Sequence, residues 1–149
     1  MSDEIYYDVV VVGAGNAALC AALAAREQGA DVAVLEKAPP SAQGGNCPYT
    51  GAGFRFTHNG LDDVRHLVPG LTDADLKHTS MAPYSAKEFR EHLTTVTFGD
   101  TSEELMEALI RESRPTVEWM HKKGVAWELP VAGSIARAAS TIPNQVGLA

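Results

Sequence analysis

The chain has 149 residues, 45% of them hydrophobic, which suffices for one sizeable core and falls in the size range of a single domain. Its formal net charge of −7 gives no long-range attraction to phosphate backbones or anionic lipids, so we expect neither a nucleic-acid nor a membrane partner. The N-terminus is acidic, and the apolar run 9–12 is far shorter than the roughly 20 residues that cross a bilayer. These features predict no membrane span and a soluble, cytoplasmic protein.

The N-terminal segment 5–36 predicts a strand, a helix and a second strand. Residues 8–12 read D-V-V-V-V, and a run that is apolar at every position is typical of a parallel strand covered on both faces. Residues 16–28 are rich in helix formers and end at Gly29, a favourable C-cap residue. Residues 31–35 supply a second β-branched run. The segment is therefore predicted to be a Rossmann-like βαβ unit of an α/β fold, with a right-handed crossover.

The next two segments lack a clear period. Residues 37–60 are rich in glycine and proline, and so long a loop within a compact domain is more often functional than idle. Residues 61–84 are polar and irregular, which predicts a surface connection.

Residues 85–124 predict a mostly helical segment. Ser85 and Glu88 have the spacing of a capping box, which predicts a helix over residues 85–96. A short strand is expected at 125–129, and the residues beyond it show no clear period.

A second helix of this segment should begin at Thr101 or Ser102 and end near Gly124. Pro115 removes a backbone donor, so we expect it to kink or split this helix. The apolar residues that lie roughly on one face are Leu105, Leu109, Val117 and Met120.

The glycine pattern between the first strand and helix carries the chemistry. Gly13 permits a sharp turn, Gly15 lets the backbone approach a pyrophosphate, and Ala18 allows close packing of helix and sheet. The free N–H groups at the helix start offer hydrogen bonds and a positive dipole to the phosphates. The predicted cofactor-binding residues of this part are Gly13, Gly15, Asn16, Ala17, Ala18, Glu36 and Lys37.

Glu36 is the acid expected to accept hydrogen bonds from an adenosine ribose, because it follows Gly13 by 23 positions and closes the second strand. A carboxylate at this place would repel a 2′-phosphate. The motif therefore favours FAD or NAD over NADP.

Longer sequence runs distinguish between these dinucleotides. The run D-V-V-V-V-G-A-G-N-A-A-L-C-A-A-L at 8–23 and the later G-G-N-C-P-Y-T-G-A-G at 44–53 resemble the fumarate reductase and succinate dehydrogenase flavoprotein superfamily. The chain is most similar to the tricarballylate dehydrogenase branch, which shares the I-R-E-S at 110–113 and the W-M at 119–120. The likeness extends over about residues 7–129 and implies FAD as the cofactor.

In that family, the segment 37–60 would contact the flavin. The resemblance assigns this role to Gly44, Gly45, Asn46, Cys47, Gly51, Ala52 and Gly53. Cys47 stands where relatives have Ser or Thr, and Ala52 where they have glycine; we interpret Cys47 as a small buried filler rather than a redox thiol. Asn46 occupies the place of the histidine that attaches FAD in succinate dehydrogenases, which implies noncovalent FAD. Consecutive glycine amides also suit an anion or the polar edge of the flavin.

The implied activity is hydride transfer between flavin and a small polycarboxylate substrate. The family's substrate-binding residues belong to a capping domain and lie beyond residue 149, so we predict no catalytic residue. The chain would be the N-terminal part of an FAD-binding domain, incomplete without its C-terminal part or a partner subunit. Two alternatives are an NAD-dependent dehydrogenase and a noncatalytic remnant that binds a partner.

The remaining polar and aromatic candidates are interpreted as structural. The histidines and cysteines lack metal-type spacing, so we predict no metal site and reduced thiols. Trp119 and Trp127 are expected to pack in a core or interface. The arginines that could bind a carboxylate but are interpreted as solvated surface charges are Arg55, Arg90, Arg114 and Arg137.

Overall fold

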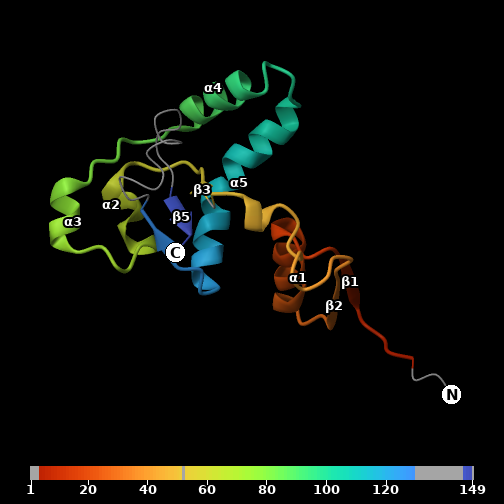
Figure 1. Ribbon diagram of the computed structural model, residues 1–149. Helices are drawn as coiled ribbons and strands as arrows, with labels where there is room; N and C mark the ends of the chain where they lie inside the picture. Colours follow the sequence, from red (N-terminus) through yellow and green to blue (C-terminus); the bar gives the residue numbers. More distant parts are fainter. Residues whose placement is uncertain (1–3, 52, 130–145, 149) are drawn as a thin grey trace. The chain divides into compact units, whose positions relative to one another are not determined.

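The computed structural model describes residues 4–51, 53–129 and 146–148. They form two compact units, and the chain passes from the first to the second between Thr50 and Gly51 (Figure 1). The first unit combines a parallel strand pair with a helix, and the second is mostly helical with short antiparallel strands. This agrees with the predicted α/β class followed by a mostly helical segment.

The first unit contains the predicted strand, helix and strand. They are β1 (Val9–Val12), α1 (Asn16–Glu27) and β2 (Val32–Leu35). The two strands pair in parallel, with Val9 opposite Val32 at one end of the register. Helix α1 lies against both strands (Figure 1). The order and the parallel pairing are confirmed.

The sheet of the first unit is covered on one face, not on both as the all-apolar run predicts. Val10, Val12 and Leu35 lie on the same face by register, and Val12 is 82% exposed. The small side chain of Ala22 is buried in α1, which packs on the opposite face. Within the described part of this unit, the apolar side chains on one face of β1 therefore remain exposed to solvent.

The segment 37–60 is not a single loop. It contains a 3₁₀ turn, η1 (Cys47–Tyr49), and a short strand, β3 (Gly53–Phe54). Beyond β3, Phe56 and His58 are buried. Side chains at every second position point inward here, as in a strand, but the many glycines and prolines of the segment mask this pattern.

The expected surface connection also contains ordered structure. It forms α2 (Leu61–Val64), a 3₁₀ turn η2 (Arg65–Leu67) and α3 (Asp73–His78). Thr72 and Asp75 form a capping box at the start of α3. Elements this short cannot show a helical period, so the prediction from periodicity was wrong. The side chains that join the core from this segment are Val64, Leu67 and Val68.

Both predicted longer helices are confirmed. Helix α4 (Ala86–Val96) begins with the capping box of Ser85 and Glu88, and α5 (Glu103–Lys122) has Ser102 as its N-cap. The two helices pack against each other in the second unit (Figure 1).

Helix α5 does not split at Pro115, and of the predicted face it buries Val117 and Met120 but not Leu105 and Leu109. Pro115 is exposed inside one uninterrupted helix, so the lost hydrogen bond is offset by packing on both sides of it. Leu105 and Leu109 are exposed, because the buried stripe is rotated by about one residue. The buried residues of α5 are Met106, Ile110, Ser113, Val117 and Met120.

A small antiparallel sheet accompanies the core of the second unit. The predicted strand at 125–129 appears as β4 (Trp127–Glu128), which pairs with β5 (Val146–Leu148), and β5 pairs with β3. Strand β5 was not predicted. Trp127 is 2% exposed at the centre of the core, and Trp119 packs against that core, as expected. A second cluster joins α4 to α5 through Tyr84, Phe89, Met106 and Ile110.

The N-cap of α5 offers a test of its assignment. Ser102 Oγ accepts a hydrogen bond from the N–H of Leu105, and losing such a cap costs about 1 kcal/mol. We therefore expect Ser102→Ala to lower the free energy of unfolding by about 1 kcal/mol in urea titrations. Thr101→Ala, its neighbour and the alternative cap, should change it by less than about 0.5 kcal/mol. A larger loss of stability in Thr101→Ala than in Ser102→Ala would show that Thr101 is the N-cap.

Candidate functional site

The turn that follows β1 has the backbone geometry that the glycine motif predicts. Gly13 has a φ of +102°, which favours glycine, and its N–H bonds to the carbonyl of Leu35 at 2.6 Å. Gly15 is the N-cap of α1, and no side chain caps this end of the helix. The N–H groups of the first turn therefore have no intrahelical partner and point out of the turn. They belong to the predicted residues Asn16, Ala17 and Ala18.

The second predicted part of the site lies against this turn. A β-carbon built on Gly15 would stand 3.7 Å from the carbonyl oxygen of Gly44. One built on Gly45 would stand 3.9 Å from the Cα of Gly15. The structure thus brings together two glycine segments that are about 30 positions apart in the sequence, and a β-carbon on Gly15 or Gly45 would make an ordinary contact across the space between them.

Glu36 connects the turn to the loop that follows β2. Its Oε2 accepts a hydrogen bond from the N–H of Ala14 at 2.9 Å, and its Oε1 accepts one from the N–H of Ala38 at 2.8 Å. The N–H of Ala38 is the main reason that the pKa of the Glu36 carboxyl lies below its ordinary value, and the N–H of Ala14 adds to this shift. The carboxylate is therefore ionised at neutral pH and sits at the mouth of the turn. The side chain of the adjacent Lys37 is exposed.

The remaining predicted contacts follow Gly45 or fall in the second unit. Asn46 is the N-cap of η1, and Cys47 is exposed, so the prediction that Cys47 is a buried filler was wrong for the described chain. Gly51 and Gly53 belong to the second unit, where Gly53 begins β3. Ala52 lies outside the described residues.

The turn of the first unit fits the diphosphate of a dinucleotide. The first turn of α1 contains no acidic residue, so its positive end is not neutralised locally. Glycines on both sides let an anion approach backbone amides without meeting a β-carbon. The carboxylate of Glu36 stands beside this cradle, bonded to the N–H of Ala14.

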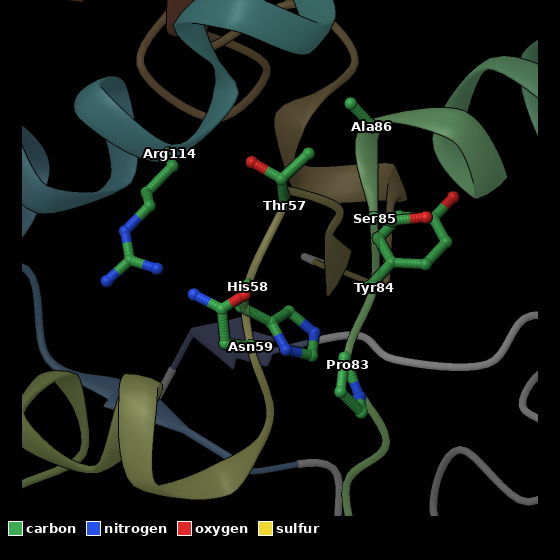
Figure 2. Close-up of a pocket in the computed structure, with 8 residues that line it drawn as sticks. All are labelled: Thr57, His58, Asn59, Pro83, Tyr84, Ser85, Ala86 and Arg114. Atoms are coloured by element: carbon green, nitrogen blue, oxygen red, sulfur yellow. The ribbon is translucent and has the colours of Figure 1, made fainter.

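The second unit holds a cavity of about 360 Å³ that sequence reasoning missed (Figure 2). At its wall, His58 is 3% exposed, and its backbone pairs with that of Tyr84. Its Nδ1 accepts a hydrogen bond from the N–H of Gly60 at 3.1 Å. Burial lowers the pKa of His58, although the nearby Asp63 opposes this shift. The residues that line the cavity are Thr57, His58, Asn59, Pro83, Tyr84, Ser85, Ala86 and Arg114.

Arg114 is not the solvated surface charge that we expected. Its guanidinium makes a two-point ion pair with Asp63, in which Nη2 lies 2.9 Å from Oδ1, and it lies 3.6 Å from Glu118. Hydrogen bonds from Arg114 are the main reason that the pKa of Asp63 falls to about 2. Arg90 is also paired, with Glu103 and Glu107 of α5. Arg55 lies near the hydroxyl of Tyr84, and Arg137 lies outside the described residues.

Comparison with known proteins gives a family match over most of the chain. The FAD binding domain family matches residues 8–146. The chain is 29% identical to an NADH:fumarate oxidoreductase of Klebsiella pneumoniae, over 80% of the chain and 11% of that protein. It is 29% identical to a vinyl phenol reductase of Lactiplantibacillus plantarum, over 82% of the chain and 21% of the relative.

A third relative is a 3-oxo-5-alpha-steroid 4-dehydrogenase of Comamonas testosteroni, 29% identical over 89% of the chain and 22% of its own length. The chain thus spans between 11% and 22% of the length of these relatives. No solved structure matches it. Among the described residues, no helix is both long enough and apolar enough to span a membrane.

Proposed function

The chain belongs to the FAD binding domain family, and from this premise we propose that it is the cofactor-binding part of an FAD-dependent oxidoreductase. The observation that carries the proposal is the uncapped N-terminus of α1, whose N-cap Gly15 lies close to the Gly44–Gly45 segment. Each of the three relatives is named as an oxidoreductase, a reductase or a dehydrogenase. The family match and the geometry of the turn therefore support the same cofactor.

Different residues of the first unit would bind different parts of the dinucleotide. The amides of Asn16, Ala17 and Ala18 would bind the diphosphate at the helix N-terminus. Glu36 would accept hydrogen bonds from the ribose hydroxyls. The Gly44–Cys47 segment would lie along the flavin side of the cofactor and hold it noncovalently. When bound, FAD supplies the hydride chemistry, and the protein supplies its position and surroundings.

We further propose a small polycarboxylate as the substrate of the whole enzyme, of the kind that tricarballylate dehydrogenases and fumarate reductases use. The resemblance of the glycine segments and the fumarate-reducing relative support this class. The vinyl phenol reductase and the steroid dehydrogenase show that substrates differ widely among relatives at the same identity. Residues that bind the substrate would come from a capping domain.

A second candidate is a chain that acts only together with a partner subunit. The exposed apolar face of Val10, Val12 and Leu35 favours it, because an apolar patch of this kind marks a contact surface. Both candidates require the same cofactor site. They differ in whether the isolated chain shows any turnover.

Titration with FAD tests the proposed cofactor directly. We expect the purified 149-residue chain to retain a yellow chromophore, and FAD fluorescence to change saturably on binding. NADH titrated under the same conditions should give a much weaker response. Tight NADH binding by a colourless chain would favour a nicotinamide-dependent dehydrogenase instead.

Glu36→Gln should weaken FAD binding about tenfold. Glutamine would place an amide N–H₂ against the N–H of Ala14 or Ala38, so one loop would lose its anchor and the ribose would lose an acceptor. Fluorescence titration measures the dissociation constant. Glu128→Gln, an exposed acid of the second unit, should leave this constant unchanged. Equal FAD affinities of the two variants would show that Glu36 does not contribute to FAD binding.

A further inference from the structure

Large apolar side chains lie exposed where α4 and α5 meet. Phe98, in the turn that joins the two helices (Figure 1), is 95% exposed. Val96 at the end of α4 is exposed, and so are Leu105 and Leu109 in the first turns of α5. We call these four residues, Val96, Phe98, Leu105 and Leu109, the hairpin patch. Single exposed apolar residues are ordinary, but a group of them in one place marks an interaction surface.

The two leucines of the hairpin patch lie on one side of the helix pair. Leu105 and Leu109 are four residues apart, so they share a face of α5. Successive side chains advance by about 100° around a helix. Met106, which packs against α4, therefore separates Leu105 on one side from Glu107 on the other. Glu107 forms an ion pair with Arg90 of α4, so the leucines lie on the side away from this ion pair.

Val96 lies on the same side as the leucines. It follows Phe89 by seven residues, or two turns, so the two side chains line up along α4. Phe89 packs against α5, and Arg90, the next residue, lies about 100° further round toward its ion pair. Val96 is therefore turned away from the ion pair. The hairpin patch thus occupies one side and the end of the helix pair.

Phe98 is held in a backbone conformation that disfavours it. Its φ of +55° lies in the left-handed region, which residues with a bulky side chain rarely adopt. The N–H of Phe98 bonds to the carbonyl of Thr95, and the N–H of Gly99 bonds to that of Thr94 at 2.9 Å, which fixes the turn. The ring is thus strained and exposed at once. Backbone strain of this kind clusters at functional positions.

The sequence around the hairpin patch is acidic. Residues 91–110 contain five acidic residues and no lysine or arginine. Three of the five form ion pairs with Lys87 or Arg90, which lie outside this range. The other two, Asp100 and Glu104, form no ion pair within the part of the chain that the structure describes. The edge of the patch would therefore repel a second copy of itself and an anionic lipid surface, and attract basic residues.

We propose that the hairpin patch docks a basic amphipathic segment of a separate polypeptide, with apolar side chains along its centre and lysine or arginine along its edges. The patch supplies the apolar contact, and Asp100 and Glu104 supply the charges that select this partner. An amphipathic helix laid against two packed helices presents its side chains in this way. All members of the patch belong to the second unit, so docking does not depend on the flavin-binding turn.

A titration of the full chain with a model peptide tests the docking surface. The probe is a helical peptide of about 18 residues that carries leucine on one face and lysine on the other, and the comparison peptide has glutamate in place of lysine. Backbone ¹H–¹⁵N spectra report each residue of the chain. We expect saturable shifts centred on residues 94–109 with the lysine peptide, and binding of the glutamate peptide at least about tenfold weaker. Equal binding of both peptides, or shifts centred on the first unit, would overturn the proposal.

Phe98→Asn separates binding from folding, because asparagine tolerates the left-handed region better than phenylalanine does. We expect this variant to raise the midpoint of urea unfolding and yet to weaken binding of the lysine peptide at least about tenfold. Tyr49→Asn removes another exposed aromatic ring, in the first unit, and is the matched control. It should change the peptide affinity less than about threefold. Equal affinities of the two variants would overturn the assignment of the patch.

The oligomeric state and FAD binding complete the test. If the chain dimerises in analytical ultracentrifugation and Phe98→Asn is monomeric, the patch binds a second copy and the basic partner is disproved. A chain that binds FAD but not the lysine peptide would disprove the docking surface alone. A chain that binds the lysine peptide at residues 94–109 but not FAD would disprove the proposed cofactor and leave the docking surface standing.

Discussion

Replacing Gly15 with alanine should leave the chain folded and weaken FAD binding about hundredfold. Gly15 has φ −76° and ψ 176°, an extended conformation that alanine adopts readily. The new β-carbon would lie 3.7 Å from the Gly44 carbonyl oxygen, an ordinary contact. It would, however, occupy the space through which the diphosphate approaches the amides of α1. Losing two charge-assisted hydrogen bonds of about 1.5 kcal/mol each gives about 3 kcal/mol, which is about a hundredfold in affinity.

Gly70→Ala is the matched control for this substitution. A β-carbon at Gly70 would meet nothing within 4 Å, and Gly70 lies far from the turn in the sequence. Thermal unfolding followed by circular dichroism should show that both variants fold, and FAD titration should separate them. Gly13→Ala would be a poorer test, because a φ of +102° at Gly13 makes any side chain strain the turn itself. Unchanged FAD affinity in Gly15→Ala would mean that the diphosphate does not lie at this turn.

The structure of the first unit could be predicted because its signals are local. The all-apolar run of β1, the helix formers of α1 and the glycine after it each act within a few residues. The same holds for the capping box of Ser85 and Glu88. A glycine pattern between such elements also predicts where free amides must lie. The closeness of Gly44 to Gly15 joins distant segments, and no local signal indicated it.

The second unit was harder to predict, because its decisive contacts join distant residues. The Asp63–Arg114 pair spans 51 positions, and neither residue has a neighbour in the sequence that indicates the other. Helix α2 and strand β5 are too short to show any period. One usable signal was missed: Phe54, Phe56 and His58 alternate inward, and this pattern would have indicated an extended segment with a buried histidine.

The same Asp63–Arg114 pair should make the free energy of unfolding decrease at acidic pH. Hydrogen bonds from Arg114 lower the pKa of Asp63 from 3.8 to about 2 in the folded chain. An unfolded aspartate keeps the ordinary value, so the stabilisation is fully present above about pH 4. It is lost as the pH falls through about 2, because both states are then protonated. Both side chains are less than a third exposed, and a shift of this size corresponds to about 2 kcal/mol.

Asp63→Asn should therefore lower the free energy of unfolding by about 2 kcal/mol at about pH 6 and by little at about pH 2. Asp62→Asn removes a neighbouring exposed carboxylate from the same helix and serves as the matched control. Urea unfolding of both variants at several pH values isolates the effect of the pair, because all other carboxylates titrate alike in both. The difference between the two variants should shrink steadily between about pH 4 and about pH 2. A difference that stays constant over this range would show that Asp63 is not stabilised by Arg114 as a carboxylate, and that its contribution comes from packing or from the hydrogen bond to Asn59.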